Sequence, residues 1–206
     1  MTVLELLDYA SVIVFALSGA LVASRAQLDI VGFSFVASLT AVGGGTVRDV
    51  ILDRNPVFWV AEPAFVGVAV LAAILVFFTA HRFESRLRVL TWLDALALSV
   101  AVPAGVGVAL ATGQHWAICL MMGVSTGCLG GLLRDVVCNE VPLVLKQGEL
   151  YVTAALAGSG AALLALNLAP SSIALLICAV VTFALRAGSL AFGWRLPVYR
   201  SRPPRR

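Results

Sequence analysis

The sequence predicts an all-α membrane protein in which seven transmembrane helices form an inverted 3+3 repeat plus one further helix. Three observations lead to this fold class: apolar blocks of bilayer-spanning length, self-similarity at a fixed offset, and glycine-rich motifs in both halves. Of the 206 residues, 61% are hydrophobic and 12% are charged, and the mean hydropathy is +1.01. A soluble domain carries about 25% charged residues, so this composition excludes an ordinary water-soluble fold.

The apolar residues lie in blocks of about 20, the length that a helix needs to cross a bilayer. The expected spans are Leu4–Ser24, Val31–Asp53, Phe58–Ala80, Val89–Ala111, Trp116–Cys138, Leu150–Leu168 and Ser171–Trp194. We therefore expect a single transmembrane domain over residues 1–206. Its parts are repeat 1 at 4–80, repeat 2 at 89–168, the seventh helix at 171–194 and a basic tail at 195–206.

The second half of the chain repeats the first at an offset of 86 positions (94 − 8). Matched pairs are Asp8 and Asp94, Thr40 and Thr126, Gly44-Gly45 and Gly130-Gly131, Arg48-Asp49 and Arg134-Asp135, and Pro56 and Pro142. Each half contains three spans, an odd number, so the second copy enters the membrane from the opposite side. This pattern predicts an inverted repeat about a pseudo-two-fold axis in the membrane plane.

The repeated motifs are Gly43-Gly44-Gly45-Thr46-Val47-Arg48-Asp49 in the second span and Gly130-Gly131-Leu132-Leu133-Arg134-Asp135 in the fifth. Glycine in a helix interior costs about 1 kcal/mol relative to alanine. One interpretation is close helix packing, and the other is a break that exposes backbone carbonyls along a hydrated path. We favour both together, so helices 2 and 5 are predicted to be broken at Gly43, Gly44, Gly45, Gly130 and Gly131, which would line a pore. Leu129 replaces the first glycine, so the second break is predicted to be milder.

Arg48, Asp49, Arg134 and Asp135 are charges well inside predicted spans. Such a charge costs at least about 2.5–3.5 kcal/mol at the centre of a lone helix, so each must face a partner or a cavity. Neighbours on a helix point about 100° apart, and we therefore expect partners on other helices or in water. A network that fixes helix register and one that sets the field along a hydrated path both remain open. Asp8 and Asp94 are expected to cap their helices.

Lys and Arg residues gather on one predicted face, at Arg25, in the run 81–88, at Lys146 and in the tail. The positive-inside rule then predicts a cytoplasmic C-terminus and an external N-terminus in the cell inner membrane. Arg200, Arg202, Arg205 and Arg206 in the tail are interpreted as a topology signal or a contact with lipid headgroups, not with nucleic acid. The four cysteines have no metal-ligand or CxxC spacing and are interpreted as small apolar residues, and no metal site is expected.

The doubled GG(G)xxRD block and the 3+3+1 layout together resemble the prokaryotic branch of the trimeric intracellular cation (TRIC) channel family. The same domain family is also labelled as a glycine transporter or as an uncharacterised membrane family. The resemblance implies a homotrimer in which each protomer has its own potassium-conducting pore, and it implies no cofactor other than the permeant ion. Carried over by motif, the pore elements are Gly43, Gly44, Gly45, Arg48, Asp49, Gly130, Gly131, Arg134 and Asp135.

We therefore expect a passive monovalent cation channel, with potassium as the permeant ion and membrane lipids as its surroundings. A secondary transporter of a small zwitterion such as glycine is the first alternative, because transporters often contain inverted repeats and broken helices. A non-conducting scaffold is the second. No span carries a nucleophile–base pair, a metal cluster or a phosphate loop, so we expect no enzyme activity and no catalytic residues. The sequence also lacks a TVGYG-type filter, so strong discrimination between potassium and sodium is not expected.

Overall fold

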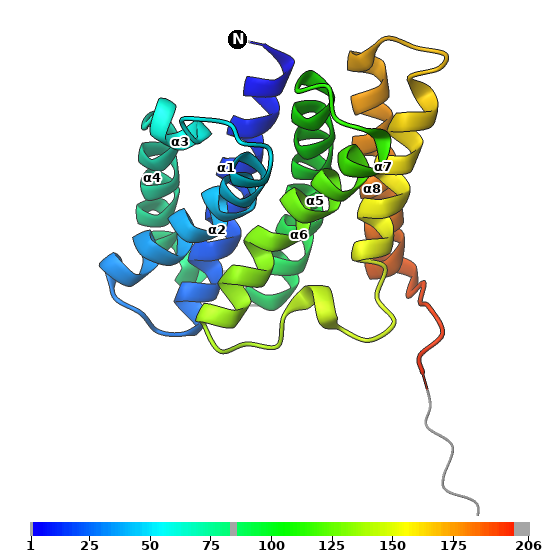
Figure 1. The fold of residues 1–206 in the computed structure, drawn as a ribbon. Helices are drawn as coiled ribbons and strands as arrows, with labels where there is room; N and C mark the ends of the chain where they lie inside the picture. Colours follow the sequence, from blue (N-terminus) through cyan, green and yellow to red (C-terminus); the bar gives the residue numbers. More distant parts are fainter. Residues whose placement is uncertain (1, 83–85, 200–206) are drawn as a thin grey trace, which may run out of the picture.

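The computed structural model describes residues 2–82 and 86–199, which form an all-helical protein (Figure 1). Its α-helices are α1 (Val3–Arg25), α2 (Ile30–Ile51), α3 (Phe58–Ala61), α4 (Ala64–Thr79), α5 (Arg86–Ala111), α6 (Trp116–Val137), α7 (Val152–Ala165) and α8 (Ser171–Phe192). Two short 3-10 helices, η1 (Ala80–Arg82) and η2 (Leu143–Leu145), follow α4 and α6. The arginines of the tail from Arg200 onward lie outside the described residues.

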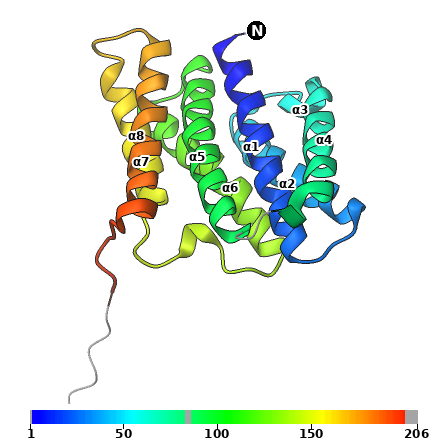
Figure 2. The ribbon, with the colours of Figure 1, turned by 180° about the vertical axis from the view of Figure 1, so that it is seen from behind.

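Six helices within the described residues are long and apolar enough to cross a membrane. The seventh predicted span corresponds to α7, whose 14 residues extend about 21 Å at 1.5 Å per residue. That length is less than the bilayer core of about 30 Å, so seven full-length spans are not confirmed. The views in Figures 1 and 2 both show α7 running antiparallel beside α8.

The third predicted span is divided into α3 and α4. Glu62, which precedes Pro63, has an extended backbone with φ −133° and ψ 88°. A residue before proline is sterically disfavoured in the α region, so the helix ends at Ala61 and α4 begins after the proline. The short helix α3 thereby delivers the backbone of Phe58 to the carboxylate of Asp49, as described below.

The helices pack as two similar groups of three. The first group joins α1, α2 and α4, and the second joins α5, α6 and α7. The groups meet through contacts of α1 with α5 and of α2 with α6, while α8 packs against α5 and α7. Figure 1 shows α2 and α6 in front of α1 and α5, and the reverse view in Figure 2 shows them behind. The N-terminus and the last turn of α8 lie at opposite ends of the molecule.

The repeat is visible in the backbone as well as in the motifs. α2 and α6 begin 86 positions apart (116 − 30) and also end 86 apart (137 − 51). Both helices terminate in the same way, since Asp53 and Asn139 have left-handed φ angles of 51° and 54°. The N–H groups of Arg54 and Glu140 then donate at 2.8 Å to the carbonyls of Asp49 and Asp135. These are Schellman-type helix ends, and they match although the residues that form them differ.

The predicted helix breaks are not seen, because α2 continues through Gly43–Gly45 and α6 continues through Gly130 and Gly131. The glycines instead allow the two helices to approach each other closely. A Cβ atom on Gly44 would collide with the backbone carbonyl oxygen of Thr126, and one on Gly130 would lie 2.5 Å from that of Thr40. The two contacts are related by the repeat. Intact helices keep their backbone hydrogen bonds internal, which a membrane interior favours over exposed carbonyls.

Candidate functional site

Arg48 belongs to a cluster of four charged side chains in the first half. The Arg48 side chain is fully buried, and its Nε donates to Asp49 Oδ1 at 2.8 Å while its Nη1 donates to Asp8 Oδ1 at 2.8 Å. Asp49 Oδ1 also accepts from Arg54 Nη1 at 2.9 Å, and Asp49 Oδ2 accepts from the backbone N–H of Phe58 at 2.9 Å. Asp49 therefore joins α2 to the loop that follows it and to α3.

The second half contains a corresponding cluster around Arg134. Its Nε donates to Asp135 Oδ1 at 2.7 Å, and its Nη1 donates to Asp94 Oδ1 at 3.1 Å and to Ser18 Oγ at 2.9 Å. Asp135 Oδ2 accepts from the backbone N–H of Leu143, at 2.9 Å, as Asp49 does from Phe58. The four motif charges thus lie in two separate clusters, each tied to a neighbouring long helix, α1 or α5.

The expected partners on other helices are present, Asp8 on α1 and Asp94 on α5, but two further expectations about these charges are wrong. Arg48 pairs with Asp49, and Arg134 with Asp135, within one helix, because the long arginine side chain bends and presents Nε sideways to the adjacent carboxylate. Asp8 and Asp94 do not cap their helices. Thr2 caps α1, where its hydroxyl accepts from the Glu5 N–H at 3.2 Å.

The sequence contains a pattern from which the pairing of Asp8 and Asp94 with the buried arginines could have been predicted. Each aspartate precedes its arginine partner by 40 positions, and both pairs are in register with the repeat. A buried arginine in an apolar helix requires a carboxylate, and these two acids are the ones that the repeat supplies at matching positions.

The two clusters differ in formal charge and in exposure. The first contains two arginines and two aspartates and is formally neutral, whereas the second contains one arginine and two aspartates and carries one formal negative charge. Arg54 is replaced at the repeat-related position by Glu140, which pairs with Arg25 at 3.4 Å. The Asp8 side chain is 13% exposed, whereas that of Asp94 is fully buried.

A small polar cavity lies beside the first cluster, where α1, α2, α5 and α6 meet. We call it the Gly44 cavity. It is lined by Asp8, Ser11, Phe15, Ala41, Gly44, Gly45, Phe58, Ala101 and Thr126. Its volume is about 10 Å³, close to the minimum that holds one water molecule. Three of the lining residues, Asp8, Ser11 and Thr126, have side chains that contain oxygen, the ligand atom that alkali cations prefer.

The other predicted glycines lie outside this cavity. A Cβ atom on Gly43 would lie 2.8 Å from the Leu133 side chain. One on Gly131 would lie 3.3 Å from both Asp94 Oδ1 and the Tyr151 hydroxyl. The structure therefore brings Gly44 and Gly45 to the polar cavity, and Gly131 to the second charge cluster.

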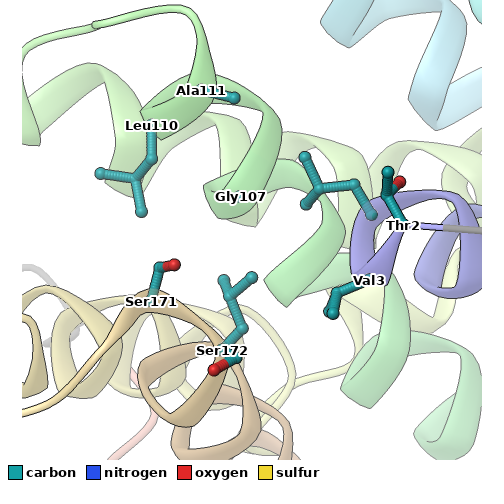
Figure 3. Close-up of a pocket in the computed structure, with 9 residues that line it drawn as sticks. Thr2, Val3, Gly107, Leu110, Ala111, Ser171 and Ser172 are labelled. Atoms are coloured by element: carbon teal, nitrogen blue, oxygen red, sulfur yellow. The ribbon is translucent and has the colours of Figure 1, made fainter.

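A larger cavity of about 310 Å³ lies elsewhere, between the start of α1, the end of α5 and the start of α8 (Figure 3). Its nine lining residues include no charged side chain. None of the residues predicted from the glycine motifs contributes to it. The larger cavity is therefore separate from both charge clusters.

A third buried arginine, Arg186 in α8, forms an ion pair that was not predicted from the sequence. Its Nη1 donates to Glu149 Oε2 at 2.8 Å, and its guanidinium lies 4.9 Å from the centre of the Tyr151 ring. The hydroxyl of the same tyrosine lies beside Gly131. Arg186 thereby attaches the helix outside the repeat to the second charge cluster.

These features define a class of protein: a multi-pass membrane protein made of two fused three-helix halves, with a paired arginine–aspartate cluster buried in each half. A family described as "Glycine transporter" matches the chain twice, at residues 5–81 and 91–167. These two segments are offset by 86 positions (91 − 5), the same offset as the motif repeat.

Curated relatives match along nearly the whole chain. A UPF0126 membrane protein of Vibrio cholerae is 36% identical over 203 residues, covering 96% of this chain and 83% of that protein. The UPF0126 inner membrane protein YadS of Escherichia coli K12 is 36% identical over 200 residues, covering 94% of each.

Solved structures match equally broadly. The TRIC trimeric intracellular cation channel orthologue from Rhodobacter sphaeroides is 44% identical, with a TM-score of 0.90, covering 94% of this chain and all of that one. A second TRIC cation channel structure is 27% identical, with a TM-score of 0.86, covering 98% of this chain and all of that one. The chain belongs to the TRIC family of membrane proteins, and the resemblance inferred from its glycine motifs is confirmed.

Proposed function

We propose that this protein is a passive monovalent cation channel that conducts potassium. The observation that carries the proposal is the match of nearly the whole chain to solved TRIC cation channels, with a TM-score of 0.90 at 44% identity. That relative is described as a trimeric channel, and we extend its assembly to a homotrimer with one pore in each protomer. The pore would run between α2 and α6, where Gly44 and Gly130 bring the two helices together.

The net formal charge along this path is compatible with a permeant cation. Arg48 and Arg134 would repel a permeant cation if they were unpaired, but each is bonded to two aspartates. The formal charge is then zero at the first cluster and negative at the second. Asp8, Ser11 and Thr126 are the residues with polar side chains among those that line the Gly44 cavity beside the first cluster.

The transporter alternative is not favoured. Its remaining support is the description of the matching family, whereas the solved relatives are cation channels. The same relatives favour a function without catalysis. The helices also run unbroken through the glycines, so the half-helix ends that serve many transporters as substrate sites are not formed.

Purified protein reconstituted into planar bilayers tests the proposal. We expect unitary currents in potassium chloride, with reversal potentials that follow the potassium gradient. Protein-free bilayers and bilayers with heat-inactivated protein are the controls. Substrate-coupled glycine uptake without unitary currents would favour the transporter. The absence of both unitary currents and glycine uptake would favour a non-conducting scaffold.

The proposed orientation places the N-terminus outside and the C-terminus in the cytoplasm. In intact cells we expect Leu168→Cys, 93% exposed in the α7–α8 loop, to react with an impermeant thiol reagent. Tyr199→Cys, 89% exposed after α8, should react only once the membrane is permeabilised. The chain without an introduced cysteine gives the background. The reverse labelling pattern would contradict the orientation.

A further inference from the structure

The two halves of the path differ at a pair of repeat-related positions beside the glycine motifs. Ala101 lines the Gly44 cavity, and its counterpart in the first half is Phe15 (101 − 86). The Phe15 ring lies 3.7 Å from the position that a Cβ atom on Gly130 would occupy. The α5 wall of the Gly44 cavity therefore carries a methyl group at the position where α1 carries an aromatic ring, while a second ring, that of Phe58, lies against Gly45.

Phe15 occupies the boundary between the two halves. Its side chain closes one wall of the Gly44 cavity and also packs against Gly130 on α6. The residue is 2% exposed, so the ring fills its site. The Asp8 side chain in the cavity wall is 13% exposed, whereas its counterpart Asp94 and its partner Arg134 are fully buried. Arg48 is fully buried as well, so Asp8 is the more accessible of the two repeat-related aspartates.

A second contact from α1 reinforces this seal. Ser18 lies one turn after Phe15, and its Oγ accepts from Arg134 Nη1 at 2.9 Å while donating to the Phe15 carbonyl at 2.9 Å. The repeat-related residue is Ala104, which has no hydroxyl, so Arg48 has no equivalent tie to α5. Helix α1 thus contributes both a ring and a hydrogen bond to the second half, and at the repeat-related positions of α5 stand Ala101 and Ala104, which have neither a ring nor a hydroxyl.

We propose that Phe15 is the residue that closes the permeation path, separating the Gly44 cavity from the half that contains Arg134. This inference rests on the proposed channel function. Potassium passes only when the ring moves away from Gly130, and the path is therefore asymmetric although the fold is a repeat. The closing ring belongs to α1, and it adds to the close contact between α2 and α6 at Gly44 and Gly130.

The test exchanges the side chains at the two related positions, 15 and 101. Each variant is reconstituted into potassium-loaded liposomes, and the potassium efflux is measured. We expect Phe15→Ala to raise potassium efflux at least roughly tenfold, the change that a barrier lower by about 1.4 kcal/mol produces. Ala101→Phe should reduce the efflux below that of the unmodified protein, because a cavity of about 10 Å³ cannot hold a ring. Adding Ala101→Phe to Phe15→Ala should reverse the increase.

Phe33→Ala is the matched control. Phe33 is also buried, at 4% exposure, and packs edge-on against Phe77 with ring centres 5.0 Å apart, away from both glycine motifs. Removing the same phenyl ring there should leave potassium efflux unchanged. If Phe15→Ala does not yield folded trimers, Phe15→Leu removes the ring but keeps an apolar side chain, and it should still raise the efflux.

The outcomes separate this inference from the proposed function. If the unmodified protein conducts and the folded Phe15 variants conduct at the same rate, Phe15 is not the seal and the channel function stands. An equal rise with Phe33→Ala would also overturn the inference, because general loosening would then explain it. If neither the unmodified protein nor any Phe15 variant passes potassium, the channel function itself fails, and the seal with it.

Discussion

Replacing Asp135 with asparagine is expected to destabilise the protein by about 3–5 kcal/mol, the cost of removing one partner of a buried ion pair. Arg134 is fully buried, and without Asp135 it keeps only its bonds to Asp94 and Ser18. Thermal unfolding of the purified protein in detergent measures the loss. We also expect a smaller cation current, because the second cluster changes from one formal negative charge to zero.

A double-mutant cycle with Arg134→Gln isolates the coupling. Removing acid and arginine together should cost less than the sum of the single changes, by at least about 0.5 kcal/mol, as for residues in direct contact. Arg54→Gln is the control, since Arg54 also pairs with a motif aspartate but is 38% exposed. That substitution should cost about 0–1 kcal/mol. Strict additivity of Asp135→Asn and Arg134→Gln would contradict the network.

The second large effect is expected at the helix contact. Gly44→Ala and Gly130→Ala should each destabilise the protein by about 1–3 kcal/mol, the usual cost of overpacking a core. The added methyl groups would meet the backbone carbonyls of Thr126 and Thr40, which cannot rotate away. The helices must then separate, and we expect a changed potassium conductance together with a lower unfolding temperature.

Gly67 and Gly160 provide the matched controls, because each lies within a helix and a Cβ atom there would meet nothing within 4 Å. Alanine should stabilise these positions by up to about 1 kcal/mol through its helix propensity. The opposite signs at the two kinds of site are the diagnostic result. If all four substitutions stabilise the protein, α2 and α6 are not in backbone contact at Gly44 and Gly130.

The sequence predicted the long helices well where apolar length alone defines them. The predicted span Trp116–Cys138 is the helix Trp116–Val137, and Leu4–Ser24 lies within Val3–Arg25. The predicted helix bounds were less accurate where a single residue interrupts a helix or where the helix is shorter than its apolar segment. Pro63 divides the third span, and only 14 residues of the predicted span Leu150–Leu168 are helical in α7.

The glycine motifs show what a local pattern leaves open. A run of glycines both weakens a helix and permits another backbone to approach, so the same residues are compatible with a break or with packing. The outcome depends on whether a partner backbone is present. Here each glycine helix supplies the partner for the other, and both remain continuous.

The sequence by itself determined the membrane class, the repeat and the positions of the paired motifs, because hydropathy, residue type and spacing are all properties of the chain. Only the tertiary structure decided which groups neutralise the buried arginines. Arg134 meets Asp94, 40 positions away, and Ser18, 116 positions away. It also decided that Phe15 lies against Gly130 and that Phe15 and Ala101 both line the Gly44 cavity. Such contacts depend on how separate helices cross and rotate against each other, and no period along a single helix encodes that geometry.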